Sequence, residues 1–311
     1  MGVALVTLLF RMEVNRVARP LSGMRIVVCG KGGSGKSTFV TLMTRVLRDK
    51  GYSVHVVDGD ASNPGLWWML GFEEAPKPLI DFYGGKFFKG GKVTCPVDDP
   101  TPLERGEIGL DEIPHEYFAE KEGLTFFRVG KIESVFEGCD GPESKVVRDF
   151  RIPGDHVTLV DLTAGLEHFA RGVEINADGV VAIVDPTSTS LELARKAKDM
   201  VEGMKRGLKP ATVHLESPKD VEMAEKLARS AKVKHLWVVL NKIRSKRIES
   251  LMRKRLEEYG IEPIGSIRED PEILESSLEG ASLRESGARE DVEKIVSELE
   301  EAARQMPRSA T

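Results

Sequence analysis

Hydrophobic positions along the chain follow two patterns that alternate. Short unbroken apolar runs are typical of strands buried on both faces of a parallel sheet, and they occupy residues 25–29, 54–57, 124–129, 157–161, 179–184, 235–240 and 263–267. Other stretches repeat apolar residues every three or four positions, as amphipathic helices do. These stretches follow residue 38, Leu191 and Ser217, or cover residues 245–259 and about 287–305. The alternation predicts an α/β fold with a doubly wound, mostly parallel sheet flanked by helices.

The same pattern predicts the limits of the domain. We expect a single domain over residues 24–305, because Met24 stands directly before the first strand. Residues 1–23 are interpreted as a leader or a misassigned start, and residues 306–311 as a disordered tail. Residues 73–123 combine glycine, proline and mixed charge without a clear period, and we interpret them as an insertion.

The composition narrows the possible partners. Hydrophobic residues make up 41% of the 311 residues and charged residues 31%, which suits a soluble protein with a full core. A net charge of −5 leaves no polybasic footprint, so we expect no nucleic-acid partner. The apolar stretch at residues 3–10 is too short to cross a bilayer. Three widely spaced cysteines indicate a reducing, cytoplasmic setting.

The clearest chemical signal follows the first strand. Residues 30–38 satisfy the G-x-x-x-x-G-K-[ST] pattern of ATP- and GTP-binding proteins. The glycines let main-chain N–H groups wrap a polyphosphate, and the next helix adds its positive dipole end. Lys36 is expected to reach the β- and γ-phosphates, and the Ser37 hydroxyl to bind Mg²⁺. The predicted nucleotide contacts of this loop are Gly30, Lys31, Gly32, Gly33, Ser34, Gly35, Lys36, Ser37 and Thr38.

Acidic residues end two of the predicted strands. Asp161 ends its strand close to where Ser37 must lie, so we expect it to hold Mg²⁺ through a water molecule. Asp58 and Asp60 come at the end of the neighbouring strand, at the edge where open α/β sheets bind their ligands.

Lys31 narrows the family. Residues 31–37 match K-G-G-x-G-K-[ST], and in this the chain resembles the MinD/ParA/nitrogenase-iron-protein superfamily of P-loop ATPases. In that family two subunits face each other across two ATP molecules, and this lysine reaches the phosphates of the other subunit. The resemblance implies an ATP-hydrolysing homodimer with Lys31, Lys36 and Asp60 as catalytic residues. Asp60 would orient the attacking water, and Asp58 would support the metal.

Two further segments resemble this superfamily. Residues 161–167 are similar to its second switch, whose moving part would include Ala164, Gly165 and Glu167. Asn241 and Lys242 resemble the pair that recognises the base, with the Asn241 amide facing adenine. Arg268 occupies the later loop that flanks the base in relatives. The preference for ATP over GTP is implied by the family alone.

A narrower resemblance covers most of residues 24–285. The sequence E-H-F-A-R-G at residues 167–172 is typical of CooC-type ATPases, which help insert nickel into carbon monoxide dehydrogenase. It implies an accessory protein that acts on a client metalloenzyme. His168 and Arg171 belong to this signature, but the sequence assigns them no role. Compared with that group, residues 207–233 are an insertion that serves either as a docking surface or as a mere addition.

Another departure from the CooC pattern concerns the metal. That group carries Cys-x-Cys, which places four thiolates across a dimer, whereas Cys139 is followed by Gly141 here. A single thiolate per subunit makes a poor site for a soft metal. Cys139 is therefore predicted to be a weak ligand at most, and nickel or zinc binding to be weak or absent.

Other functions stay open at this point. One is a positioning or partition ATPase, although the acidic C-terminal helix would be repelled by anionic lipid, so we expect no membrane partner. Another is an electron-donor ATPase with a shared iron–sulfur cluster, for which Cys95 and Cys139 are the candidate ligands. A small-molecule kinase is disfavoured because Lys31 argues for a dimeric switch. Trp67 and Trp68 could belong to the core, to a dimer interface or to a partner surface.

Overall fold

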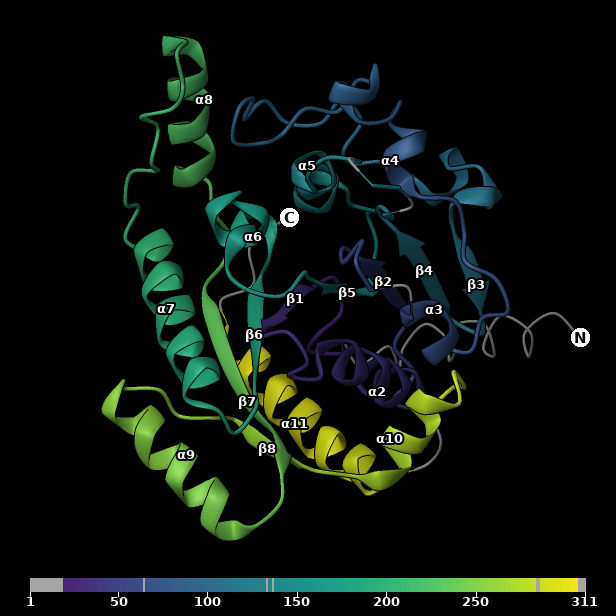
Figure 1. Ribbon diagram of the computed structural model, residues 1–311, viewed down its shortest axis with the longest axis vertical. Coiled ribbons are helices and arrows are strands. Elements are labelled where there is room, and N and C mark those ends of the chain that lie inside the picture. Colours follow the sequence, from purple (N-terminus) through teal and green to yellow (C-terminus); the bar gives the residue numbers. More distant parts are fainter. Residues whose placement is uncertain (1–18, 64, 133, 136, 284–285, 307–311) are drawn as a thin grey trace, which may run out of the picture.

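The computed structural model describes residues 19–63, 65–132, 134–135, 137–283 and 286–306. An eight-stranded sheet runs through it in the order β3-β4-β2-β5-β1-β6-β7-β8 (Figure 1). The strands are β1 (Arg25–Gly30), β2 (Val54–Asp58), β3 (Ala119–Lys121), β4 (Leu124–Arg128), β5 (Val157–Asp161), β6 (Gly179–Val184), β7 (His235–Ile243) and β8 (Gly265–Arg268). All neighbours are parallel except β3 and β4, which confirms the predicted mostly parallel sheet.

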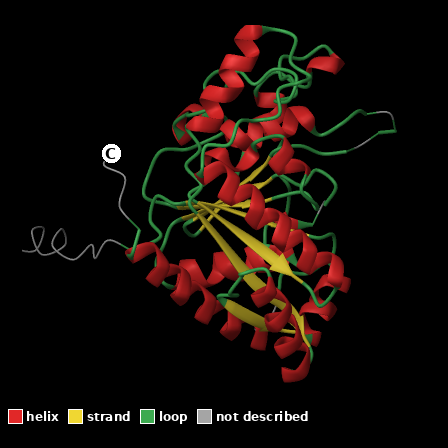
Figure 2. Ribbon diagram, turned by 90° about the vertical axis from the view of Figure 1, so that its left-hand side faces the viewer, coloured by secondary structure: helices red, strands yellow, loops and turns green. Residues whose placement is uncertain are grey.

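Helices cover both faces of the sheet (Figure 2). They are α2 (Lys36–Asp49), α3 (Leu66–Met69), α4 (Leu79–Phe82), α5 (Gly141–Asp149), α6 (Glu167–Ala170), α7 (Ser188–Lys205), α8 (Pro218–Arg229), α9 (Lys246–Glu258), α10 (Pro271–Leu278) and α11 (Gly287–Arg304). The 3₁₀ turns are η1 (Phe87–Lys89), η2 (Leu110–Glu112), η3 (His115–Tyr117) and η4 (Val173–Asn176).

The central strand β1 explains this layering. Its side chains point to alternate faces of the sheet, as in any strand. Ile26 and Val28 pack into a core that includes residues of α2 and α11. Val27 and Cys29 pack into a second core that includes residues of α5, α7 and α9. Both faces of β1 are therefore buried, which is why its sequence is an unbroken apolar run.

Several elements lie where the sequence pattern indicated none, among them α5, α10 and the edge strand β3. In α5, the charged residues Glu143, Lys145, Arg148 and Asp149 are all buried, and they break up the apolar stripe that would indicate a helix. α10 buries only Ser276, so it also lacks such a stripe. β3 lies near the end of the first insertion and adds an antiparallel strand to the sheet. It is short and mostly exposed, so its sequence lacks the apolar run that would predict a strand.

The start of the domain needs a correction. We expected residues 1–23 to be a leader, yet Leu21 is fully buried in the core, and the Gly23 N–H donates to the carbonyl of His156 over 3.2 Å. The Arg19 guanidinium also lies 5.6 Å from the ring centre of Tyr52. Residues 19–23 therefore pack onto the sheet, and residues 1–18 lie outside the described part of the chain.

Of the tail predicted at residues 306–311, only Met306 belongs to the described part of the chain. Met306 is partly buried against the core, and residues 307–311 lie outside the described part.

Trp67 packs against the same core, while its neighbour Trp68 meets it edge to face. Across the described residues, none of the helices combines the length and the hydropathy needed to cross a membrane.

Candidate nucleotide-binding site

The phosphate loop links β1, at the centre of the sheet, to the start of α2. Gly35 has a φ angle of 99°, which L side chains rarely adopt, and a Cβ at this position would collide with the side-chain amide of Asn241. The Ser34 hydroxyl is fully buried and has no hydrogen-bond partner among the described residues. A buried donor left open in a loop of this shape fits a ligand that brings acceptor atoms, as a polyphosphate does.

Ser37 and Asp161 come together as the sequence predicts. The Ser37 hydroxyl donates to Asp161 Oδ2 over 2.5 Å, and the other Asp161 oxygen is buried without a partner among the described residues. Asn63 Nδ2 donates to the same Ser37 hydroxyl over 2.8 Å. The sequence did not single out Asn63, although this residue belongs to the loop that begins at Asp58.

Asp58 and Asp161 face each other at the ends of the adjacent strands β2 and β5, and both are buried. Burial raises the pKa of Asp58 well above its usual value, and the charge of Asp161 raises it further. Burial also raises the pKa of Asp161 to about 7, although the Ser37 hydrogen bond and the Lys36 charge oppose this. A nearby cation would favour the ionised forms of both, so the donor set fits Mg²⁺.

Asp60 lies two residues beyond the end of β2 and is largely buried. Its own N–H donates to Asp58 Oδ1 over 3.2 Å, and its Oδ1 accepts from the Ser62 N–H and hydroxyl over 3.0 and 2.5 Å. These contacts hold the Asp60 carboxylate in place at the strand end. The role of Asp60 in orienting water stays a prediction.

The second switch lies directly against the phosphate loop. The Gly165 N–H donates to the Gly30 carbonyl over 3.2 Å, and a Cβ at Gly32 would lie 3.6 Å from the methyl group of Ala164. Glu167 accepts the Leu166 N–H over 3.0 Å with one carboxylate oxygen. These contacts join residues 164 and 165 to the phosphate loop; their movement with a nucleotide stays a prediction.

His168 has a structural role that the sequence did not reveal. It is buried at the start of α6, with Nε2 2.9 Å from the Gly165 carbonyl and Nδ1 in contact with the buried carboxylate of Glu174. The imidazole thus joins the switch glycine to η4. The spacing of six residues between His168 and Glu174 carries no helical or strand signal that could have predicted this pair.

Lys31 bonds within its own chain. Its ammonium lies 3.3 Å from Asp185 Oδ2, just beyond β6, and the lysine side chain is 35% exposed. Burial would raise the pKa of Asp185, but hydrogen bonds from Thr187, Lys31 and Ser190 outweigh it and lower the pKa. From the resemblance we expected Lys31 to reach the phosphates of a second subunit, and the sequence indicated no partner for it in its own chain.

The predicted base-binding residues divide into two groups. Asn241 Nδ2 donates to the Ser34 carbonyl over 2.7 Å, and Lys242 Nζ donates to the Gly33 carbonyl over 2.8 Å, so both support the phosphate loop. The Arg268 guanidinium instead forms two hydrogen bonds with Asp291 of α11, at 2.8 and 2.7 Å. Base recognition by these three residues stays a prediction. In this structure the Arg268 guanidinium is bonded to Asp291.

We expected Cys139 to be the single thiol at this place, but Cys95 lies close to the same position. A Cβ at Gly141 would lie 2.7 Å from the sulfur of Cys95 and 3.4 Å from that of Cys139. Both thiols therefore converge on the space that a side chain at residue 141 would fill. The chain offers two thiols at this place, because Cys95 arrives from the first insertion.

One known protein family matches the part of the chain that contains both the phosphate loop and the sheet. A family profile described as the CobQ/CobB/MinD/ParA nucleotide binding domain matches residues 26–283. An ATP-binding protein of Methanocaldococcus jannaschii is 39% identical over 184 residues, which is 58% of this chain and 74% of that protein. The carbon monoxide dehydrogenase accessory protein CooC of Rhodospirillum rubrum is 29% identical over 64% of this chain and 77% of its own length.

A solved structure gives the same fold. The septum site-determining protein MinD of Pyrococcus horikoshii, in complex with Mg-ADP, superposes with a TM-score of 0.56 at 18% identity. The superposition covers 90% of this chain and 97% of that protein. The family profile and the match to CooC confirm the resemblance to the MinD/ParA superfamily and, within it, to CooC-type proteins.

Proposed function

This chain belongs to the CobQ/CobB/MinD/ParA nucleotide-binding family, and from that premise we propose that it is an ATP-hydrolysing, dimeric switch that assists the maturation of a metalloenzyme. One observation carries the enzymatic part of the proposal: the Ser37 hydroxyl and the Asp161 carboxylate meet at 2.5 Å beside the phosphate loop, with the other Asp161 oxygen open. Resemblance to CooC supports the accessory role.

The side chains have distinct tasks in this proposal. Lys36 and the first N–H groups of α2 bind the phosphates, while Ser37 and Asp161 would hold Mg²⁺. The ion, when bound, neutralises negative charge on the β- and γ-phosphates. Asp60 holds the attacking water in line with the γ-phosphate, since its position is set by Ser62 and by the end of β2.

Dimerisation follows from Lys31. In the single chain its ammonium pairs with Asp185. A γ-phosphate on a second copy offers more negative charge than one carboxylate, so ATP favours transfer of Lys31 to the partner and ADP does not. A cation supplied in this way to the transferring phosphoryl group increases the rate by about a thousandfold or more.

Steady-state hydrolysis of ATP with Mg²⁺, together with nucleotide binding, tests the enzymatic part. Lys36→Ala is expected to lose binding, because the phosphates lose their main cation. Asp60→Ala is expected to bind ATP normally and to lose turnover by at least about a hundredfold. Asp111→Ala, which removes an exposed aspartate of η2, is the matched control and should leave both unchanged. Normal turnover by Asp60→Ala would refute its assigned role.

The accessory role needs a separate test. Asp60→Ala protein loaded with ATP should stay in the dimeric state and retain its client, which mass spectrometry can identify after copurification. Recovery of a metalloenzyme, and its failure to acquire metal in cells that lack this protein, would support the proposal. Recovery of a septum or partition component instead would favour the positioning ATPase.

A further inference from the structure

Two cysteines from distant parts of the sequence meet at the start of α5. Cys139 stands just before the helix, and Cys95 belongs to the first insertion. Their sulfur atoms lie 3.4 and 2.7 Å from the position that a Cβ of residue 141 would take. Only glycine leaves this space open, so the sequence at residue 141 and the position of Cys95 fit each other. Cys139 is exposed and Cys95 is partly buried.

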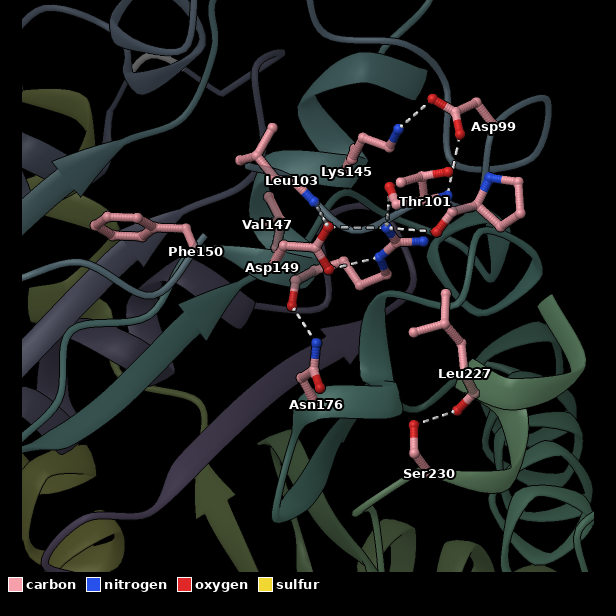
Figure 3. Close-up of polar contacts among 12 residues, drawn as sticks. Asp99, Thr101, Leu103, Lys145, Val147, Asp149, Phe150, Asn176, Leu227 and Ser230 are labelled. Atoms are coloured by element: carbon pink, nitrogen blue, oxygen red, sulfur yellow. Dashed lines mark hydrogen bonds and ion pairs between the residues drawn. The ribbon is translucent and has the colours of Figure 1, made fainter. Parts of the chain in front are cut away.

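The segment that carries Cys95 is anchored to the same helix as Cys139. Lys145 Nζ of α5 donates to Thr94 Oγ1 over 2.7 Å and to Asp99 Oδ2 over 2.9 Å, one on each side of Cys95. The Asp99 N–H closes a turn onto the Cys95 carbonyl at 2.9 Å. Figure 3 shows Lys145 reaching Asp99, with Asp149 of the same helix bonded to the Leu103 N–H over 2.8 Å.

Further contacts fix the surroundings of both thiols. The ring of Phe88 packs against Gly138, next to Cys139, and His214 Nε2 lies 2.9 Å from the carbonyl of Val97, two residues beyond Cys95. His214 belongs to the second insertion, so the two insertions touch at this place, where α8 stands beside the loop of the first insertion (Figure 1). Contacts from three segments thus surround the two thiols.

Paired thiols suit a particular class of ligand. Soft thiolates select Zn²⁺, Ni²⁺ and similar ions over Mg²⁺, and each thiol gives up its proton on binding. Among the described residues there is no group of three or more His, Cys, Asp or Glu side chains arranged for a metal. Two thiolates alone would leave the remaining positions to water or to an outside ligand. Structural zinc sites are closed by four protein ligands, so an open pair suits an ion that is passed on.

A charged link runs from this place to the second switch. Arg171, which ends α6, donates to Asp140 Oδ2 over 2.7 Å and to Ser144 Oγ over 3.3 Å. Asp140 stands between Cys139 and Gly141 and caps α5. The other end of α6 begins at the switch residue Glu167. A movement of α6 would therefore reach Asp140, the residue between Cys139 and Gly141.

We propose that Cys95 and Cys139 together bind one thiophilic divalent cation per chain, with loss of two thiol protons, and that Arg171 couples this site to the second switch. The metal site stands on the thiol geometry. Its use as cargo, and its coupling to ATP, rest on the function proposed above. Cys95 thus supplies the second thiol that the residue at position 141 lacks.

The first test is a Co²⁺ titration of the reduced, metal-stripped full-length protein without nucleotide. A thiolate-to-cobalt charge-transfer band should appear, saturate at one Co²⁺ per chain and vanish on addition of Zn²⁺. Cys95→Ser and Cys139→Ser should each lose the band. Cys29→Ala, which removes the third and deeply buried thiol, is the matched control and should keep it. Absence of the band in the unchanged protein, or its full retention in Cys95→Ser, overturns the site.

A second variant guards against a misfolded serine mutant. Gly141→Ala keeps both thiols but puts a methyl group where the Cys95 sulfur and Cβ would lie 2.7 and 3.0 Å away. We expect an unchanged melting temperature within a few degrees and a loss of cobalt affinity of about tenfold or more. Unaltered cobalt affinity in Gly141→Ala overturns the convergence of the two thiols. Iron with acid-labile sulfide in the isolated protein would replace the single ion by a cluster and also overturn the proposal.

The coupling has its own readout. A non-hydrolysable ATP analogue should change the cobalt affinity of the unchanged protein, and Arg171→Ala should abolish that change while binding cobalt normally without nucleotide. Arg171→Lys should restore part of it. An analogue effect that persists in Arg171→Ala overturns the link. ATP turnover without metal binding would refute this inference and leave the ATPase proposal intact, and metal binding without turnover would do the reverse.

Discussion

Lys31 and Asp185 form an ion pair between residues 154 positions apart, at the rim of the nucleotide site. The lysine side chain is 35% exposed, and ion pairs of this kind contribute about 0–1 kcal/mol. Asp185 can therefore hold the ammonium in place without preventing its transfer. In the proposed dimer, this pair would keep Lys31 available for a second copy at little cost in energy.

Lys31→Ala is predicted to bind ATP through Lys36 but to remain monomeric and inactive, because no cation crosses to the partner. Asp185→Asn is predicted to do the opposite: with its own partner weakened, Lys31 should support dimers at a roughly two- to fivefold lower protein concentration. Sedimentation with a non-hydrolysable analogue measures both. Dimers of normal stability in Lys31→Ala would reduce this residue to a surface lysine.

Local motifs and the meeting of Ser37 with Asp161 could be predicted from the sequence, but other long-range partners could not. The loop at residues 30–38 is recognisable because its pattern is local, and the strand-end carboxylates Asp58 and Asp161 follow from the apolar runs before them. Asp185 and Asn63 meet Lys31 and Ser37 only through the folded sheet. The pairing of Cys95 with Cys139 likewise depends on the path of an insertion without sequence period.

At the scale of the element, the imidazole of His168 connects the second switch to η4. His168 joins the Gly165 carbonyl to the carboxylate of Glu174, and both side chains are almost fully buried. A residue that follows the switch thus connects it to η4, on which α5 also packs. The E-H-x-x-R-G signature therefore contains two connecting residues, His168 toward η4 and Arg171 toward α5.

His168→Ala is predicted to reduce the free energy of unfolding by about 3–5 kcal/mol, because it leaves the buried Glu174 without its partner. The double variant His168→Ala/Glu174→Ala should be less destabilised than the sum of the two single variants, since no lone carboxylate remains. Urea unfolding of the three proteins measures this. Strict additivity would show that the two side chains do not interact.

Buried charge can hide an element from prediction. The helix α5 was hidden because four of its nine residues are charged and buried, where the Arg148 guanidinium bonds to Asp149 over 2.7 and 2.8 Å. Figure 3 shows how Lys145 and Asp149 reach the first insertion, at Asp99 and at the Leu103 N–H. Only the completed contacts satisfy these charges, so the pattern of a lone segment does not indicate them.

At the scale of the molecule, a stacked pair of histidines stands at the opposite end of the sheet from the phosphate loop. His55 lies in β2 and His156 directly precedes β5, with ring centres 3.5 Å apart. Burial lowers the pKa of His55 to about 3, and the neighbouring His156 lowers it further. Burial also lowers the pKa of His156.

This pair predicts acid sensitivity. A histidine with a lowered pKa binds its proton more readily in the unfolded chain, so its contribution to stability is complete above pH 6.5 and declines as pH falls toward the folded pKa. For His55 the loss reaches about 2 kcal/mol at pH 5. Melting temperatures between pH 7.5 and 5 should fall less for His55→Gln than for the unchanged protein. The exposed His115→Gln is the control, and an equal fall in all three would remove the pair as the cause.

The order in which the sheet is assembled has a consequence for synthesis on the ribosome. The phosphate loop is made early, but β1 pairs with β5 and β6, and the loop itself is braced by Asn241. α2 is covered last, by α11, where Glu300 binds Lys50 at 2.8 Å and Tyr52 at 2.6 Å. A nascent chain that ends before Gly287 therefore exposes the apolar face of α2. Such a chain already carries its nucleotide motif but lacks the helix that covers α2, so it depends on chaperones until synthesis is complete.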